Sequence, residues 1–290
     1  MRYAAPATVD EASALLSDNP GSQVFAGATD LVPQMRSGRP APSVLVDLKG
    51  IERLTSVTHE DGQWTIGAAT PAADLTRDAA FSATFPGLSE GAGLIGSDQI
   101  QNRSSLGGNL ANASPAADSV PALIANAGQA VIATADGTRT VPASEIVTGP
   151  GSTSLADGEF IVEFTLADPP AGTGDAYLRM IPRTEMDIAI VGAAVRVTVD
   201  DDSITDAIVV LGAVAPTAVI VPDAAAALVG TSVAGGSIDD NVLAALAEAA
   251  SAACDPIDDK RGTIAYRRQV AGVLAKRAAV IAVERAQNGV

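Results

Sequence analysis

The order of hydrophobic and polar positions predicts a chain that mixes helices and strands from its first residues. Thr8-Val-Asp-Glu11 matches a capping box, and Leu15 and Leu16 continue the spacing of an amphipathic helix that ends at Asn19-Pro20-Gly21. A short strand at 23–25 then leads into a glycine loop at 26–30, and residues 31–36 return to helical spacing. The pattern here is strand, glycine loop, helix.

The rest of the chain divides into a mixed part and a part with longer strands. Further apolar strands are predicted at 44–48 and 64–68, and Thr70-Pro71 is expected to cap a helix with proline in its first position. Later strands are expected at 160–166, 189–199 and 208–221, with an acidic turn at 200–203, followed by a helical alanine tract at 224–227 and helices at 238–253 and 263–286. We therefore predict an α+β protein with a boundary near 169–172, giving units of 1–170 and 171–290.

Composition and charge narrow the functional classes. Asp and Glu outnumber Lys and Arg by 34 to 18, which gives a net charge of −16 and argues against a nucleic-acid-binding surface. Only three of the basic residues are lysines, which fits a GC-rich or salt-adapted host. The single cysteine, Cys254, excludes an intramolecular disulfide and a cysteine-ligated cluster within this chain.

The sequence also predicts a cytoplasmic protein without a membrane span. Asp10 and Glu11 interrupt the N-terminus before any signal-like apolar stretch forms. The apolar, uncharged stretch 207–222 is shorter than the roughly 20 residues that a span requires, and it contains Gly212 and Pro216.

Two glycine-containing segments carry candidate chemistry. The loop at 26–30 can bring backbone N–H groups close to an anion such as a pyrophosphate, because Gly27 has no side chain. An alternative interpretation is a plain turn in which Asp30 caps the next helix. The second segment, 100–121, holds Gly107-Gly108 among small and polar residues, so the two loops together suggest one extended phosphate ligand.

Several motifs together resemble one known family. They are Phe-Ala-Gly-Ala-Thr-Asp-Leu at 25–31, Thr-Ile-Gly-Ala-Ala-Thr at 65–70, the run from Gln-Ile-Gln-Asn-Arg-Ser-Ser-Leu-Gly-Gly-Asn to Asp at 99–118, Tyr-Leu-Arg-Met-Ile-Pro-Arg-Thr-Glu-Met-Asp-Ile-Ala at 177–189, Leu-Gly-Ala-Val-Ala-Pro-Thr at 211–217 and Arg-Gly-Thr-Ile-Ala-Tyr-Arg at 261–267. In this order they closely resemble the FAD-binding medium subunit of molybdenum hydroxylases, the family that includes xanthine dehydrogenase and carbon monoxide dehydrogenase. The resemblance covers nearly the whole chain.

The resemblance implies a fold, a cofactor and a set of contacts. The fold is an FAD-binding domain of the vanillyl-alcohol-oxidase or PCMH type, in two subdomains, followed by a smaller α+β C-terminal domain. The cofactor is FAD, with these residues implied around it: Ala26, Gly27, Ala28, Thr29, Asp30 and Leu31 on the pyrophosphate; Ser105, Gly107, Gly108 and Asn109 as a second cradle; Asp118 on polyol or ribose hydroxyls; Ile95 lining the cofactor; Ile161 near adenine; Tyr177 and Arg179 near the flavin ring.

The resemblance further implies a role within a complex. A large molybdopterin subunit would oxidise substrate, a small [2Fe-2S] subunit would carry electrons, and FAD on this chain would pass them to a terminal acceptor, in a dimer of heterotrimers. Neither His59, in an acidic turn, nor Cys254 lies in an FAD motif, so we expect non-covalent FAD. No metal site is expected in the acidic turn at 200–203.

One position departs from the usual family pattern Ala-Gly-Gly-Thr-Asp, which this chain replaces with Ala-Gly-Ala-Thr-Asp. The usual second glycine of the first loop is Ala28, and a positive φ there would cost roughly 1 kcal/mol or more. Thr29-Asp30 stands where well-known carbon monoxide dehydrogenases carry His-Ser, which favours a larger organic substrate.

Two other hypotheses remain open: a stand-alone flavin oxidase with its own substrate pocket, and a flavin-less paralogue that serves in assembly.

Overall fold

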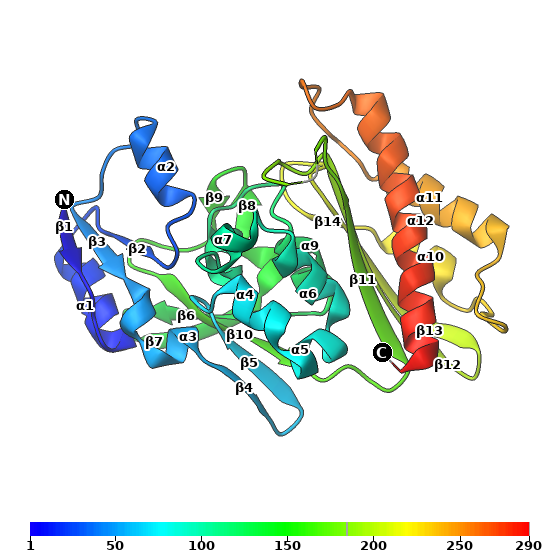
Figure 1. Ribbon diagram of the computed structural model, residues 1–290, viewed down its shortest axis with the longest axis horizontal. Coiled ribbons are helices and arrows are strands. Elements are labelled where there is room, and N and C mark those ends of the chain that lie inside the picture. Colours follow the sequence, from blue (N-terminus) through cyan, green and yellow to red (C-terminus); the bar gives the residue numbers. More distant parts are fainter. Residues whose placement is uncertain (184, 290) are drawn as a thin grey trace.

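The computed structural model of the protein describes residues 1–183 and 185–289. It contains three main sheets that follow one another along the molecule, with the N-terminal sheet at one end and the C-terminal sheet at the other (Figure 1). Two sheets with their helices precede residue 170, and the third sheet with its helices follows it. The expected α+β organisation, with two subdomains and a smaller C-terminal part, is confirmed.

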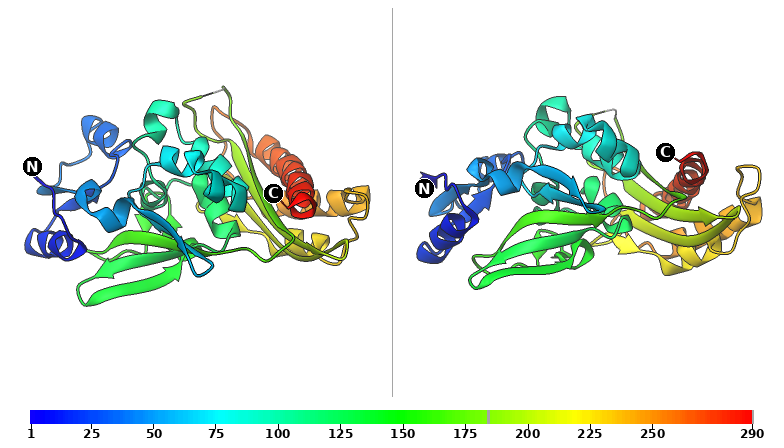
Figure 2. Two further views of the ribbon diagram at one scale, coloured as in Figure 1. Left: turned by 60° about the horizontal axis from the view of Figure 1, so that its bottom comes forward. Right: turned by 90° about the horizontal axis from the view of Figure 1, so that it is seen from below.

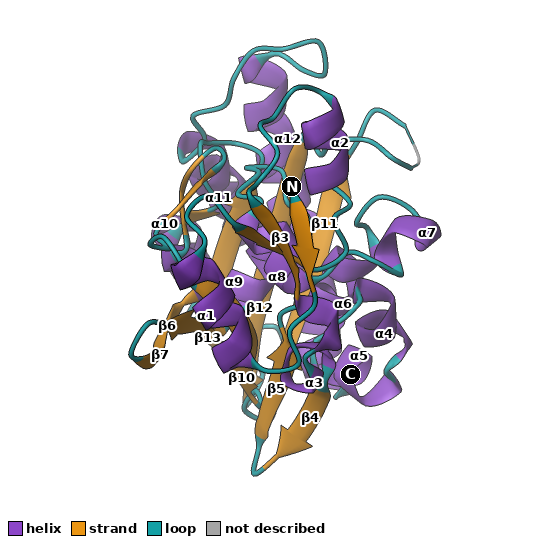
Figure 3. Cartoon of the chain, turned by 90° about the vertical axis from the view of Figure 1, so that its left-hand side faces the viewer, coloured by secondary structure: helices purple, strands orange, loops and turns teal. Residues whose placement is uncertain are grey.

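The first subdomain is a small parallel sheet with two helices beside it (Figure 3). Its strands are β1 (Arg2–Ala4), β2 (Gln23–Phe25) and β3 (Val44–Asp47), in the order β1-β3-β2, and its helices are α1 (Val9–Asp18) and α2 (Leu31–Arg36). The capping box is present, because the Thr8 hydroxyl accepts from the Glu11 N–H at 3.1 Å while the Glu11 carboxylate accepts from the Ala7 N–H at 2.7 Å. The predicted strand, loop and second helix are therefore confirmed at 23–36.

The second subdomain is an antiparallel sheet covered by short helices. Its strands are β4 (Val57–Glu60), β5 (Gln63–Gly67), β6 (Gln129–Thr134), β7 (Gly137–Pro142) and β10 (Phe160–Ala167), in the order β4-β5-β10-β6-β7. The helices are α3 (Glu52–Thr55), α4 (Ala72–Arg77), α5 (Ala79–Thr84), α6 (Pro86–Gly93), α7 (Asp98–Gln101), α8 (Leu106–Ala111) and α9 (Ser119–Ala125), with 3₁₀ turns at Leu48–Gly50 and Ala143–Glu145 and a small hairpin of β8 (Val147–Gly149) and β9 (Ser152–Thr153).

Two local expectations needed correction. Helix α4 begins at Ala72 with Pro71 in the cap position, one residue later than expected, because the Thr70 hydroxyl donates to the Ser56 carbonyl at 3.3 Å instead of capping. The apolar run 208–221 is two strands, β13 (Ser203–Gly212) and β14 (Val219–Ile220). They are separated at Ala213, which has φ of 62° and donates its N–H to the Pro115 carbonyl.

The third sheet lies between helices of the second subdomain and the C-terminal helices. Strands β11 (Thr173–Met180), β12 (Val191–Asp200), β13 and β14 are antiparallel, and α10 (Pro222–Leu228), α11 (Asp240–Ala252) and α12 (Ile264–Asn288) follow them. Side chains of β12 alternate between two cores: Val191, Val195 and Val197 pack with α12, whereas Ala194 belongs to the core shared with α9. The sheet is therefore buried between α12 and the helices α6 and α9 (Figure 2).

The polypeptide passes from the second subdomain to the third sheet between Ala167 and Thr173. The units 1–170 and 171–290 are proposed on this basis. Thr184, within the motif at 177–189, and the terminal Val290 lie outside the described residues.

Candidate functional site

The first glycine loop connects β2 to α2 and requires glycine for a packing reason. A Cβ on Gly27 would stand 1.7 Å from the carbonyl oxygen of Arg103, so the two loops touch through their backbones. The next residue, Ala28, has φ of 57°, the left-handed conformation whose cost the sequence predicted for a non-glycine residue. The loop keeps this strained conformation at Ala28 and turns sharply into α2.

The same loop presents a row of free backbone donors. Among the described residues, the N–H groups from Gly27 to Leu31 find no hydrogen-bond acceptor, while the Ala28 and Asp30 carbonyls accept from Val32 and Gln34 of α2. Asp30 occupies the cap position of α2 without a capping hydrogen bond from its side chain. Successive unpaired N–H groups form a concave surface that suits a phosphate. Asp30 is thus the N-cap residue by position, as the plain-turn interpretation expected, but its side chain makes no capping hydrogen bond.

A lysine that sequence reasoning missed holds the start of this loop. The Lys49 ammonium donates to the Ala26 carbonyl at 3.0 Å, pairs with Asp47 at 2.6 Å and lies 4.2 Å from the centre of the Phe25 ring. These contacts hold the Ala26 carbonyl on the side of the loop opposite to its unpaired N–H groups. Lys49 therefore orients the loop.

The second glycine segment forms the start of α8, and its backbone donors are used within the protein. The Ser105 hydroxyl accepts from the Gly108 N–H at 3.0 Å, and the Gly107 N–H donates to the Ala68 carbonyl at 3.1 Å. The free group is instead the hydroxyl of Ser104, which is buried and has no partner in the described chain. The side-chain amide oxygen of Asn109 accepts a hydrogen bond from the Ser119 hydroxyl at 2.7 Å, which leaves the Asn109 side-chain NH₂ group available.

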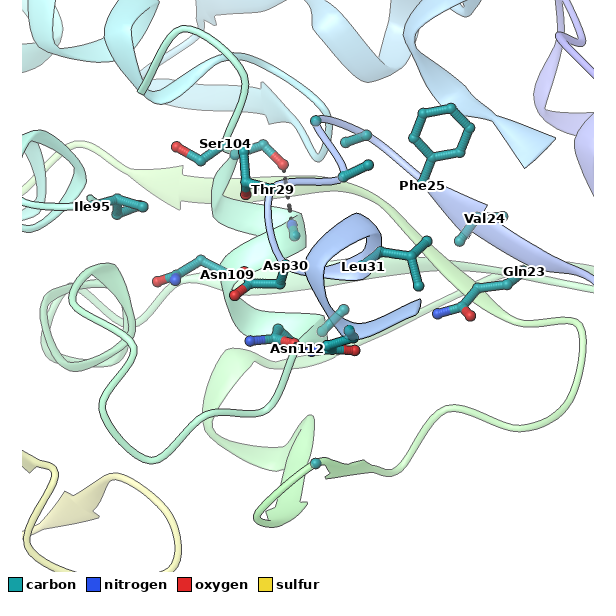
Figure 4. A pocket seen from close by; sticks show the side chains of 18 of the residues that line it. Gln23, Val24, Phe25, Thr29, Asp30, Leu31, Ile95, Ser104, Asn109 and Asn112 are labelled. Atoms are coloured by element: carbon teal, nitrogen blue, oxygen red, sulfur yellow. Dashed lines mark hydrogen bonds between the residues drawn. The ribbon is translucent and has the colours of Figure 1, made fainter. Parts of the chain in front are cut away.

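These two segments face each other across one pocket (Figure 4). Ten of the residues expected at the cofactor line it: Ala26, Gly27, Ala28, Thr29, Asp30, Leu31, Ile95, Ser105, Gly108 and Asn109. Nine lining residues were not expected: Gln23, Val24, Phe25, Gln34, Arg39, Ser104, Ala111, Asn112 and Gly151. Ser104, as the first residue of the Ser-Ser pair in the motif, was the one with a visible sequence signal.

The pocket fits a phosphate-containing cofactor better than a metal ion. It encloses about 250 Å³, and its free groups are the donors named above together with one acceptor, the Asp30 carboxylate. Its charged lining residues are Arg39 and Asp30, and the loss of hydration raises the pKa of the Asp30 carboxyl. No group of three potential metal ligands occurs in the described parts of the chain. Free donors facing a polar cavity suit a pyrophosphate and its attached ribose groups.

Three of the other expected residues form a buried cluster at the contact between α9 and the third sheet. The carboxylate of Asp118 accepts from Arg179 at 2.6 Å and from the Tyr177 hydroxyl at 3.2 Å. Burial raises the pKa of Asp118 to about 6, because lost hydration outweighs the attraction of the Arg179 guanidinium and the two hydrogen bonds. None of the three lines the pocket.

The last two expected residues are also outside the pocket lining. A Cβ on Gly107 would be 2.4 Å from the Ala68 carbonyl oxygen, so this glycine is needed for close packing of α8 on the second subdomain. Ile161 is buried in β10, where it pairs with Ile132. The cofactor roles of Gly107, Ile161 and the Asp118 cluster remain predictions.

The two residues considered for covalent attachment lie elsewhere. His59 stacks on Trp64 with ring centres 4.5 Å apart and pairs with Asp168 at 2.9 Å. Cys254 is buried, and burial raises the pKa of its thiol to about 11. Neither lines the pocket. Within residues 1–183 and 185–289, no helix is both long and apolar enough to cross a membrane.

Comparison with known proteins agrees with the fold and identifies a family. Residues 1–168 match the family described as the FAD binding domain in molybdopterin dehydrogenase, and residues 176–281 match the CO dehydrogenase flavoprotein C-terminal domain. The carbon monoxide dehydrogenase medium chain of Hydrogenophaga pseudoflava is 33% identical over 95% of this chain and 94% of its own length. The xanthine dehydrogenase FAD-binding subunit of Escherichia coli O157:H7 is 34% identical over 74% of each chain.

Similarity extends to three-dimensional structure. A chain of the carbon monoxide dehydrogenase structure from Hydrogenophaga pseudoflava superimposes with a TM-score of 0.92 at 34% identity, over 98% of both chains. The resemblance seen in the sequence motifs is confirmed, and with it the cofactor, FAD. The chain belongs to the family of FAD-binding medium subunits of molybdenum hydroxylases and is a subunit of an FAD-dependent oxidoreductase.

Proposed function

We propose that this chain carries FAD as an electron relay, accepting electrons from iron–sulfur clusters on a partner subunit and passing them to a terminal acceptor. The observation that supports this most is the row of free N–H groups from Gly27 to Leu31 across the pocket from Ser104. Bound FAD supplies the redox chemistry, and the protein supplies binding and orientation.

The residues of the pocket have defined tasks in this proposal. The N–H groups of 27–31 bind the pyrophosphate, the Ser104 hydroxyl and the Asn109 NH₂ group donate to neighbouring oxygens, and Ile95 provides an apolar contact. The Asp118, Tyr177 and Arg179 cluster ties the FAD-binding domain to the C-terminal domain. We propose domains of 1–170 and 171–290 on the same grounds.

Partners are needed because of what the chain lacks. One cysteine cannot ligate an iron–sulfur cluster, and the sole histidine pairs with Asp168 outside the pocket. The relatives are named as a medium chain and as a subunit, so each is one chain of a larger enzyme. We infer a large molybdopterin subunit and a small [2Fe-2S] subunit, assembled as a dimer of heterotrimers in the cytoplasm.

The test is anaerobic reduction of the purified FAD-loaded chain. Purines, aldehydes and carbon monoxide are each added while flavin absorbance is followed, first alone and then with the two partner subunits. Bleaching of the flavin that requires the partner subunits supports the proposed electron-transfer role. Bleaching by any of these compounds without partners, at a rate fast enough for turnover, contradicts it and favours a stand-alone oxidase.

The identity of the effective compound tests the expectation about substrate. Thr29-Asp30 in the first loop favours a larger organic molecule over carbon monoxide. Bleaching of the assembled complex by carbon monoxide alone would make that expectation wrong. A chain that binds no FAD at all would instead support the assembly paralogue.

A further inference from the structure

Three side chains form a hydrogen-bonded series along the side of the pocket, and we call them the amide relay: Arg39, Gln34 and Asn112. The guanidinium of Arg39 donates to the Gln34 side-chain oxygen, and the Gln34 NH₂ group donates to the Asn112 side-chain oxygen at 2.9 Å. Gln34 lies on α2 and Asn112 at the end of α8. The relay therefore connects the two subdomains beside the pocket.

The relay has only one stable direction. Arginine donates hydrogen bonds and accepts none, so Gln34 must turn its oxygen towards Arg39. The Gln34 NH₂ group then faces Asn112, whose side-chain oxygen must accept the hydrogen bond. As a result, the NH₂ group of Asn112 is left without an acceptor among the residues described. Arg39, exposed at the rim, thus decides which end of a half-buried amide is free to meet a ligand.

The position of the relay suggests which part of the cofactor it meets. Gln23 and Ile95 mark opposite ends of the pocket in Figure 4, and the Gly27 to Leu31 loop lies between them. Arg39 also donates to the Gln23 side-chain oxygen at 3.3 Å, so the Arg39 end of the relay lies at the Gln23 end of the pocket, while Asn112 lies between Gln23 and Ile95. Val24 and Phe25 lie beside Gln23, and Ser104 and Asn109 lie on the Ile95 side. The apolar side chains at the Gln23 end suit a planar adenine ring, and the donors on the Ile95 side suit the oxygens of the pyrophosphate and of the flavin's polyol chain.

We propose that the amide relay presents the Asn112 NH₂ group as a donor to the adenosine half of the cofactor, and that Arg39 and Gln34 are positioning residues for it. Adenine ring nitrogens and ribose oxygens are hydrogen-bond acceptors, which match this donor. The inference rests on the proposed function, namely that this pocket holds FAD. It adds a means of distinguishing a dinucleotide from a flavin mononucleotide.

An almost isosteric substitution reverses the relay. In Gln34→Glu, both side-chain oxygens accept, so Arg39 keeps its partner but Asn112 must rotate and donate to the new carboxylate. The Asn112 oxygen then takes the place of its NH₂ group and meets acceptors of the ligand. Because the ion pair with Arg39 replaces a hydrogen bond, the flavin-free variant should melt no lower than the parent.

Binding is measured by calorimetry with three probes, FAD, ADP and FMN, on the full-length flavin-free chain. Gln34→Glu should weaken FAD and ADP about tenfold or more and leave FMN within twofold, since a mismatched polar pair costs on the order of one tenfold step. Gln63→Glu is the charge-matched control, because it adds the same negative charge at an exposed residue of β5 that does not line the pocket. It should weaken FAD no more than about threefold.

Arg39 provides a second test that adds no negative charge. Arg39→Met frees Gln34 to rotate and should weaken FAD and ADP, whereas Arg39→Lys keeps a donor-only group and should restore most of the affinity. If Gln34→Glu fails to fold, this pair decides the question. Equal losses in Gln34→Glu and Gln63→Glu, or a loss for FMN as large as for FAD, would overturn the proposal. A parent chain that binds neither FAD nor ADP would contradict the proposed function itself.

Discussion

Ala28→Gly should stabilise the protein, although alanine-to-glycine changes usually destabilise. Ala28 has φ of 57°, where a side chain costs roughly 1–2 kcal/mol. Glycine removes that cost, but it also raises the conformational entropy of the unfolded chain. This entropy offsets about 0.4–1 kcal/mol of the gain in stability. The expected net gain is about 0.5–1 kcal/mol in the free energy of unfolding, or roughly 1–4 °C in melting temperature for a domain of this size.

The assay compares thermal and denaturant midpoints of the flavin-free parent, Ala28→Gly and a matched control. Ala111→Gly is that control, because Ala111 is exposed, lines the same pocket and lies in α8, so the change should cost up to about 1 kcal/mol. The FAD dissociation constant of Ala28→Gly should stay within about twofold of the parent, since the loop keeps its conformation. If Ala28→Gly were destabilised as much as the control, the left-handed conformation at residue 28 would be refuted.

Three other substitutions test the site. Gly27→Ala should lose both FAD binding and stability, measured by flavin content and melting temperature, because the new Cβ would collide with the Arg103 carbonyl oxygen at 1.7 Å. Gly108→Val should lose FAD while the fold is retained, since only the Ser105 hydroxyl, at 3.3 Å, lies near the added carbon, and equal flavin content would remove this residue from the cofactor site. For Asp118, the folded pKa of about 6 exceeds its ordinary value of 3.8, so its contribution to stability is full below pH 4 and is lost as pH rises through 6. Relative to Asp118→Asn, the parent's free energy of unfolding should fall by up to about 3 kcal/mol between pH 4 and pH 7, and parallel pH profiles would contradict the raised pKa.

Elements with complete local signals were predictable from the sequence. Helix α1 has its capping box, and α12 begins after Thr263, whose hydroxyl accepts from the Tyr266 N–H. Both helices also have enough length for an apolar periodicity to emerge. The β2 strand and its glycine loop could be placed because the loop residues change abruptly from apolar to small.

Other elements were missed because their identity depends on packing. Helices α5 and α6 have six and eight residues, too few for a clear period, and their sequences are mostly Ala, Ser and Gly. The β6–β7 hairpin did carry a signal, Asp136-Gly137, which reverses the chain between two strands that pair in register. That dipeptide could have revealed the hairpin.

The site was predictable only where it follows the backbone motif. The first loop and Gly108 were identified because small residues at fixed spacing are visible in a sequence. Gln34 and Asn112 are 78 positions apart and belong to different subdomains, so no local pattern relates them. Arg39 lies in a polar loop, where an arginine at the surface is unremarkable. Their relation arises only because the fold brings α2 and the end of α8 to the same pocket.

The chemistry of the pocket also explains how so acidic a protein can bind a dianionic group. The net charge is −16, yet the pocket contributes one cation, Arg39, and one carboxylate, Asp30, which cancel formally. Attraction must therefore come from dipoles at short range: the N–H groups of 27–31, the Ser104 hydroxyl and the free NH₂ groups of the asparagines. Dipoles fixed by the fold act within a few ångströms and are weakly screened by salt, whereas the long-range field of the surface is screened beyond about 8 Å at physiological ionic strength. Under the proposed function, recognition of the cofactor therefore does not depend on the net charge, and we expect the conformation of the first loop, rather than the number of basic residues, to control binding.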